Sequence, residues 1–239
     1  MPLIEVDPKT QKKRIFIYGD NGSGKTHLSL TCPGKKLLID WFANAIEVAQ
    51  SKFSKDLEAG NIKIVKGPQK WMDINQMVKT PLDPLIDWAD TVILDNLTGM
   101  YREITEDVAQ NLPMKGNEGY RPSPELIILR DYGLSAERVR YVLGKVLDNL
   151  APTKHLIAIC HTKLNKDKEG AVISGNPSLP GEVPAYTLSL FPEQIYLRAT
   201  SDGVRHAHFT HTGLFPATTR ILDGKTVDSP DLSKIYKWT

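Results

Sequence analysis

The sequence predicts an α/β fold built on a mainly parallel sheet, and three observations support this class. Short apolar, β-rich runs alternate with segments of helical spacing, as expected of parallel strands joined by crossover helices. The run 91–95 (TVILD) is almost entirely apolar, which is typical of a strand covered on both faces. A glycine-rich turn separates the first apolar run from the first helical segment.

The composition is that of an ordinary globular protein. The 239 residues are 41% hydrophobic and 24% charged, and 30 Lys and Arg against 28 Asp and Glu give a net charge of +2. These values exclude disordered and collagen-like chains. We expect no membrane span and no secretion signal, because no stretch approaches ~20 uninterrupted apolar residues. Cys32 and Cys160 lie in apolar surroundings, which favours buried thiols and a cytoplasmic location.

The first half of the chain predicts strands and helices in alternation. Apolar runs predict strands at 14–18, 36–40, 62–65 and 91–95. Helices are expected between them at 27–31, 43–57 and 68–78. Pro33 and Gly34 end the first of these helices.

The second half predicts two longer helices, at 98–111 and 135–150, the latter with Ser135 as its N-cap. A buried strand is expected at 155–160, and the C-terminal part, 194–221, reads as β-rich. The polar segments 112–124 and 163–184 predict loops, the first of them mobile. Without repeats or linkers, we expect one domain over 1–239 with its core at about 13–221.

The glycine-rich turn carries the most specific motif of the chain. Its sequence, GDNGSGKT, fits G-x-x-x-x-G-K-[ST] between a strand and a helix. Glycines let backbone N–H groups converge on phosphate oxygens, while Lys25 reaches the terminal phosphates and Thr26 ligates Mg²⁺. The predicted nucleotide-binding residues are Gly19, Asp20, Asn21, Gly22, Ser23, Gly24, Lys25, Thr26 and His27.

A carboxylate at the end of a neighbouring strand is also needed to hold Mg²⁺ beside a nucleoside triphosphate. Asp95 closes the TVILD strand. By itself, such an aspartate is equally typical of a turn after a strand. Together with the phosphate-binding loop, it predicts a Mg²⁺ site made by Thr26 and Asp95, with ATP and Mg²⁺ as cofactors.

Three segments follow the loop in a recognisable order: VILDNLT around Asp95, DYGLSA from Asp131, and ICHTK around His161. This order resembles the RecA-type recombinase core, in particular the small phage-encoded, core-only RecA-like ATPases of single-strand DNA annealing and recombination. The resemblance covers about 13–220. It implies a RecA-like P-loop NTPase fold and an ATPase in the cytoplasm of a bacterial host.

The resemblance also implies catalytic roles. His161 lies where the family has a polar residue that contacts the γ-phosphate, although a strand-end histidine with one backbone hydrogen bond is the alternative. The family's catalytic glutamate is replaced by Phe42, which predicts slow hydrolysis. Asp40 either orients the attacking water, a role for which Glu47 is a poorer candidate, or only caps its strand. The predicted catalytic residues are Lys25, Asp40, Asp95, His161 and Arg220.

By the same resemblance, two loops hold single-stranded DNA, and ATP sites lie between subunits of a ring or filament. The first loop offers Lys115, Tyr120 and Arg121, and the second offers Lys163, Lys166 and Lys168; cations and an aromatic suit this ligand. Arg220 would reach the γ-phosphate of the next subunit, with Arg205 and Lys225 as alternatives. A single-strand-binding protein is a further possible partner.

The expected function is therefore a slow, DNA-dependent ATPase of phage recombination or annealing. Two other classes stay open. A kinase-like P-loop enzyme would use segment 112–124 as a lid over a small molecule or nucleotide. A nucleotide-dependent scaffold would bind protein in place of DNA.

Overall fold

A central sheet runs through the computed structural model, which describes residues 11–79, 83–111, 127–220 and 225–238. Its strands are β1 (Arg14–Gly19), β2 (Lys36–Asp40), β3 (Ile62–Lys66), β4 (Thr91–Asp95), β5 (His155–Lys166), β6 (Val172–Pro177), β7 (Glu193–Ala199), β8 (Arg205–His208) and β9 (Thr226–Asp228). The order is β3-β2-β4-β5-β1-β7-β8-β9, with β6 paired to β5.

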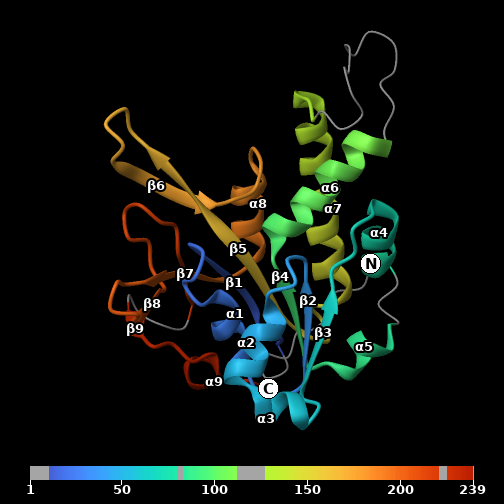
Figure 1. Cartoon of the computed structure of the whole chain (residues 1–239), viewed down its shortest axis with the longest axis vertical. Helices are drawn as coiled ribbons and strands as arrows, with labels where there is room; N and C mark the ends of the chain where they lie inside the picture. Colours follow the sequence, from blue (N-terminus) through green and yellow to red (C-terminus); the bar gives the residue numbers. More distant parts are fainter. Residues whose placement is uncertain (1–10, 80–82, 112–126, 221–224, 239) are drawn as a thin grey trace, which may run out of the picture.

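Most of the sheet is parallel, which confirms the predicted fold class. Strands β3, β2, β4, β5, β1 and β7 pair in parallel. The antiparallel pairs are β5–β6, β7–β8 and β8–β9, so the C-terminal part is β-rich as expected. Figure 1 shows β5 and β6 projecting together from the sheet.

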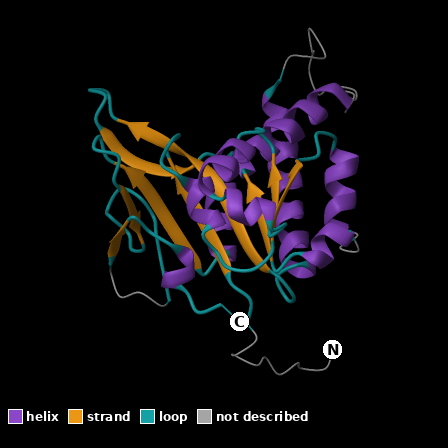
Figure 2. Ribbon diagram, turned by 60° about the horizontal axis from the view of Figure 1, so that its bottom comes forward, coloured by secondary structure: helices purple, strands orange, loops and turns teal. Residues whose placement is uncertain are grey.

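Helices cover both faces of the sheet (Figure 2). One face packs against α4 (Trp71–Lys79), α5 (Pro84–Trp88), α6 (Leu97–Asn111), α7 (Leu129–Asn149) and α8 (Val183–Leu190). The other packs against α1 (Lys25–Leu30), α2 (Ala45–Lys52), α3 (Ser54–Glu58) and α9 (Leu232–Ile235). Alternate residues of β1 enter the two cores, Phe16 and Tyr18 on one side and Ile15 and Ile17 on the other. Period-2 side-chain alternation in a doubly covered strand explains its continuous apolar run.

The structure corrects three predictions. The expected loop 163–184 is the end of β5, the strand β6 and the start of α8; its polar residues face solvent on a hairpin outside the core, and Pro184 lies in the first turn of α8, where proline is tolerated. Ser135 is not an N-cap, since α7 begins six residues earlier, and its hydroxyl donates to the Asp131 carbonyl within the helix. The helix expected at 43–57 breaks at Phe53 into α2 and α3.

The carboxyl ends of β1, β2 and β4 meet at one edge of the sheet, and β5 continues past this edge to Lys166. Gly19 at the end of β1 lies in register with His161 of β5, and Asp40 at the end of β2 lies in register with Asp95 of β4. Ligands of open α/β sheets bind at this kind of edge. Among the described residues, no helix has the length and apolarity needed to cross a membrane. The segment 112–124 lies outside the described residues.

Candidate functional site

The turn from β1 to α1 has the backbone of a phosphate-binding loop. Gly24 has a φ of +91° directly before the first residue of α1, a conformation that L side chains rarely adopt. Gly19 is required for a different reason, because a Cβ there would lie 2.1 Å from the Leu197 carbonyl oxygen of β7. The Ser23 N–H donates to the Asp20 carbonyl at 3.2 Å and closes the turn. The loop thus presents the backbone amides at the start of α1 to an anion.

The Lys25 ammonium is buried and bonded to its own loop. Its Nζ donates to the carbonyl oxygens of Gly19 at 2.9 Å and Asp20 at 2.7 Å. Burial lowers the Lys25 pKa to about 8, and the nearby Asp95 partly opposes this effect. Because a bound polyanion would favour the charged form, this lysine is suited to bind phosphate.

Thr26 and Asp95 lie together, as a shared Mg²⁺ site requires. The Thr26 hydroxyl donates to Asp95 Oδ2 at 2.6 Å across 69 positions of sequence. Burial raises the Asp95 pKa to about 6, with the Thr26 hydrogen bond opposing and the Asp40 charge adding to the effect. A hydroxyl beside a buried carboxylate is a hard-oxygen pair that fits Mg²⁺.

Asp40 is occupied by backbone amides. Its Oδ1 accepts from the N–H groups of Phe42 and Ala43, both at 2.9 Å, and its Oδ2 accepts from Ala45 N–H at 2.8 Å. The carboxylate therefore holds the turn between β2 and α2. The structure favours the capping role among the two that the sequence left open for Asp40.

Replacing Asp40 with asparagine is expected to destabilise the fold more than it slows catalysis. The NH₂ group of the introduced amide would face a backbone N–H where a carboxylate oxygen now accepts, at a cost of about 1–3 kcal/mol. Thermal unfolding without nucleotide measures this cost, and steady-state ATP hydrolysis at a temperature where both proteins are folded measures catalysis. A fall in kcat of more than about 10²-fold at unchanged stability would instead assign Asp40 a role at the attacking water.

His161 is a neutral side chain with a free donor. Asn96 Oδ1 accepts from Gly99 N–H at 2.9 Å, so Asn96 Nδ2 faces His161 Nε2 at 3.2 Å and donates to it. This assigns the ring proton to Nδ1, which is buried with no hydrogen-bond partner among the described residues. Burial and the Lys25 charge lower the His161 pKa to about 4. An uncharged Nδ1–H at the edge of the sheet suits an oxygen of a phosphate or a water.

Phe42 lines the cleft at the position where the resemblance to the RecA-type core predicts a catalytic glutamate. Its ring lies 5.8 Å from the His161 ring, and the Arg102 guanidinium lies 5.4 Å from its centroid. The neighbouring Trp41 is buried, with its indole N–H bonded to the Pro68 carbonyl at 3.0 Å. Trp41 thus packs in the core.

These residues line one cleft of about 710 Å³. Its described walls are Asn21, Gly22, Gly24, Lys25, Thr26, His27, Asp40, Phe42, Asn44, Val48, Ser51, Lys52, Asp95, Asn96, His161 and Arg205. The volume lies within the range of small-molecule and cofactor sites. Convergent backbone amides, a lysine and a hydroxyl–carboxylate pair in one cleft provide what a nucleoside triphosphate with Mg²⁺ needs.

Other predicted residues lie apart from this cleft. Arg220 is exposed, and its backbone N–H donates to Glu193 Oε1 at 3.2 Å. Lys163, Lys166 and Lys168 lie exposed on the β5–β6 hairpin. Lys115, Tyr120 and Arg121 lie outside the described residues.

Two residues of the site were missed or placed differently by sequence reasoning. Asn96 orients His161, and its position directly after Asp95 was the available signal. Arg205, considered only as a residue contributed to a neighbouring subunit, lines the cleft of its own chain. No sequence signal places β8 beside the loop, since that contact depends on the order of the strands.

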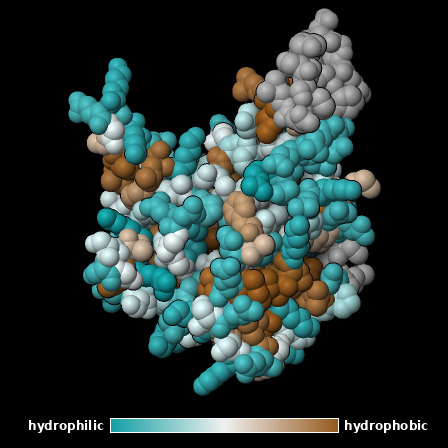
Figure 3. All heavy atoms as spheres, in the orientation of Figure 1, coloured by the Kyte–Doolittle hydropathy of each residue, from teal (hydrophilic) through white to brown (hydrophobic). Residues whose placement is uncertain are grey.

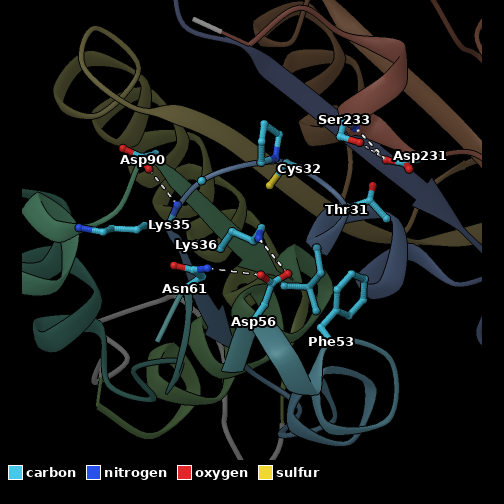
Figure 4. Close-up of a pocket in the computed structure, with 13 residues that line it drawn as sticks. Thr31, Cys32, Lys35, Lys36, Phe53, Asp56, Asn61, Asp90, Asp231 and Ser233 are labelled. Carbon is cyan, nitrogen blue, oxygen red and sulfur yellow. Dashed lines mark hydrogen bonds and ion pairs between the residues drawn. The ribbon is translucent and has the colours of Figure 1, made fainter. Parts of the chain in front are cut away.

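A second hollow, of about 570 Å³, opens near the amino ends of β2 and β4 (Figure 4). Two of its carboxylates already have partners: Lys36 Nζ lies 3.7 Å from Asp56, and Asp90 accepts from the Lys35 backbone N–H at 2.8 Å. Figure 4 shows the Lys36 and Asp56 side chains pointing toward each other. Since the glycine-rich loop lies at the other edge of the sheet, this hollow is not the nucleotide site.

Comparison with known families agrees with the geometry. The family model described as AAA domain matches residues 11–220, which include the phosphate-binding loop, Asp95 and His161. No curated protein matches the sequence. The chain therefore belongs to the AAA domain family, and its mainly parallel sheet with this loop is that of a P-loop NTPase.

Proposed function

We propose that this protein binds Mg²⁺-ATP in the cleft at the carboxyl edge of the sheet and hydrolyses it slowly. The contact between Thr26 and Asp95 carries the proposal, because it joins a loop hydroxyl and a buried carboxylate beside Lys25. Mg²⁺ in such a site neutralises charge on the phosphates. Lys25 binds the terminal phosphates, and Asp95 and Thr26 hold the ion.

Slow turnover is supported by the groups around His161. Position 42 is a phenylalanine and offers no carboxylate to activate a water. The Asp40 carboxylate already accepts three backbone N–H groups, which compete with a water for its oxygens. A positioned general base is typically worth 10²- to 10⁴-fold. His161 Nδ1–H can hold the γ-phosphate or the water, but it is a donor and takes no proton.

The protein is further proposed to bind single-stranded DNA through the β5–β6 hairpin. Strand β5 passes from His161 in the cleft to Lys166 at the exposed end, so one continuous strand joins the two places. The lysines at 163, 166 and 168 form no ion pair with a described residue, whereas Asp167 Oδ1 is used by two N–H groups of the turn. Figure 3 shows hydrophilic side chains at the hairpin tip above a hydrophobic patch. The exposed Leu164, Val172 and Ile173 contribute apolar surface to this hairpin.

Assembly into a ring or filament is part of the same proposal. Arg220 is exposed and outside the cleft of its own chain, which supports a role toward the γ-phosphate of a neighbouring subunit, worth about 10³- to 10⁵-fold in rate for such an arginine. The biological setting that we propose is phage recombination or annealing, with a single-strand-binding protein as a further partner. The resemblance around Asp95 and His161 supports that setting.

Because β5 joins His161 in the cleft to the hairpin lysines, we propose that the bound nucleotide controls the affinity for DNA, and we expect ATP to tighten DNA binding. Anisotropy of a labelled oligothymidylate is measured with ATP, ADP and no nucleotide, and ATP is expected to lower Kd by about 10-fold or more, since differential affinity is what shifts a two-state element. In the ATP state, replacing Lys163, Lys166 and Lys168 with glutamine should reduce the slope of log affinity against log salt by about 2, at about 0.7 for each phosphate contact on a single strand.

A matched triple substitution at exposed lysines elsewhere, Lys55, Lys66 and Lys70, is expected to leave the slope much less changed. His161→Ala should bind DNA equally well with ATP and ADP. Equal wild-type affinities in all three nucleotide states would contradict the coupling. Absence of any salt-dependent DNA binding would favour a protein-binding scaffold instead.

A further inference from the structure

An arginine of β8 lies directly against the phosphate-binding loop of its own chain. A Cβ built on Gly24 would come within 2.3 Å of Arg205 Nε and 3.0 Å of its Cζ. Arg205 also lines the cleft together with Lys25 and Thr26. A side chain at position 24 is therefore disfavoured by the φ of +91°, and it would also displace the arginine from the loop.

The Arg205 guanidinium is left without a counter-ion within the described part of the chain. It is half-buried, and no described residue forms an ion pair or hydrogen bond with its side chain. The Asp228 carboxylate contacts the adjacent His206, with 2.6 Å between Asp228 Oδ1 and His206 Nδ1. The backbone of Arg205 is fixed, since it pairs with Ala199 of β7 and its carbonyl accepts from Ser229 N–H at 2.8 Å. A positioned, unpaired guanidinium beside convergent backbone amides is an anion site, because guanidinium donors match phosphate oxygens.

The position of Arg205 along the loop indicates which phosphates it meets. Arg205 lies against Gly24, the residue directly before Lys25, and so beside the backbone that leads into α1. In loops of this kind the backbone amides hold the α- and β-phosphates, while the lysine reaches the β- and γ-phosphates. Because Arg205 lies beside this loop backbone at Gly24 and lines the same cleft, it is placed to meet the α- and β-phosphates.

We infer that Arg205 binds the α- and β-phosphates of the nucleotide in cis, so that its contact is shared by nucleoside diphosphates and triphosphates. This inference rests on the proposed nucleotide binding and changes the role of Arg205 from a residue donated to a neighbour to one that serves its own site. The contact adds affinity for product as well as substrate, and it leaves the γ-phosphate to Lys25, His161 and the metal site.

Fluorescent ADP and ATP analogues, titrated with Mg²⁺ into wild type, Arg205→Gln, Arg205→Lys and Arg198→Gln, test the inference. Arg205→Gln is expected to raise Kd by about 10- to 100-fold, by the same factor for both nucleotides, with kcat at saturation much less affected. Arg205→Lys should recover part of the loss. Arg198 is exposed on the neighbouring strand, and Arg198→Gln should bind as wild type does. Thermal unfolding without nucleotide checks that each variant is folded.

Two results would overturn the inference: wild-type affinity of Arg205→Gln for both nucleotides, or a loss confined to ATP, which would move the contact to the γ-phosphate. Mixing Lys25→Ala with Arg205→Gln distinguishes cis from trans. The mixture is assayed at an ATP concentration well below the Kd of Arg205→Gln, where each variant alone hydrolyses little. In cis, no mixed oligomer contains a complete site and activity stays low, whereas recovery of hydrolysis on mixing would show that Arg205 serves a neighbour. Failure of wild type to bind either nucleotide would instead overturn the proposed function itself.

Discussion

Replacing Lys25 with alanine is expected to reduce ATP hydrolysis by about 10³-fold and to weaken ATP binding by at least about 10-fold. The ammonium is buried and held by the carbonyls of Gly19 and Asp20, within reach of the cleft where the phosphates would lie. Burial disfavours the charged form of Lys25 and lowers its pKa to about 8. The variant therefore loses a group whose charge is more favourable when an anion is bound.

The fold should not suffer from this substitution. Because the Lys25 pKa is lower in the folded protein than the ordinary 10.5, charging this group costs folding free energy below pH 8, and Lys25→Ala removes that cost. Thermal unfolding without nucleotide should give a Tm close to that of wild type, because the removed cost offsets the loss of the hydrogen bonds to Gly19 and Asp20. Added ATP should raise the Tm of wild type by more than that of Lys25→Ala. Lys66→Ala, at an exposed position on the same edge of the sheet, is the control for a general effect of charge. Hydrolysis by Lys25→Ala at the wild-type rate would refute the assignment of the nucleotide site.

Replacing Asp95 with asparagine is expected to lower hydrolysis by about 10²- to 10³-fold while leaving the fold in place. Asparagine retains an oxygen that can accept the Thr26 hydroxyl, now bonded to Asp95 at 2.6 Å, but it loses the charge that Mg²⁺ needs. Nucleotide affinity in EDTA should match wild type, whereas the gain in affinity on adding Mg²⁺ should be largely lost. Undiminished Mg²⁺ dependence would show that the ion is held elsewhere.

The pH profile gives Asp95→Asn a second readout. The Asp95 pKa is raised from 3.8 to about 6, so wild-type Mg²⁺ binding should decline as pH falls through about 6, when the carboxylic acid forms. Higher Mg²⁺ should move this midpoint to lower pH, because the ion binds only the carboxylate. The variant has no such group and should be insensitive to pH over this range. The raised pKa favours folding at low pH and is a cost above pH 6, so Asp95→Asn should unfold no more easily than wild type at neutral pH.

The sequence predicted the sheet and the loop because their signals are local. A continuous apolar run such as TVILD is typical of a strand that is buried on both faces. Glycines are favoured at positions 22 and 24 because φ is positive there. The predictions failed where a solvent-exposed element lacks an apolar pattern. The β5–β6 hairpin, with its exposed lysines, reads as a loop although its strands pair over five register positions.

The partnerships within the site could not be read from the chain. Thr26 and Asp95 are 69 positions apart, and His161 is 65 positions from Asn96. Their contacts arise because β1 and β4 end at one edge of the sheet and β5 passes between them. The sequence leaves two roles open for Asp40, orienting a water or capping, and the three backbone N–H groups that donate to its carboxylate favour capping. Arg205 meets Gly24 across 181 positions, through the antiparallel return of β8 beside β7.

The α/β class, the position of the phosphate-binding loop and the residue types in that loop follow from the order of amino acids, because backbone geometry and side-chain periodicity are properties of neighbours in the chain. Which of these groups can act depends on how the chain folds around them. Burial set the pKa values of Lys25, Asp95 and His161, and hydrogen bonding occupied Asp40 while leaving Arg205 available. Desolvation and pairing depend on what surrounds a group in space, and strand order, not spacing along the chain, supplies those surroundings.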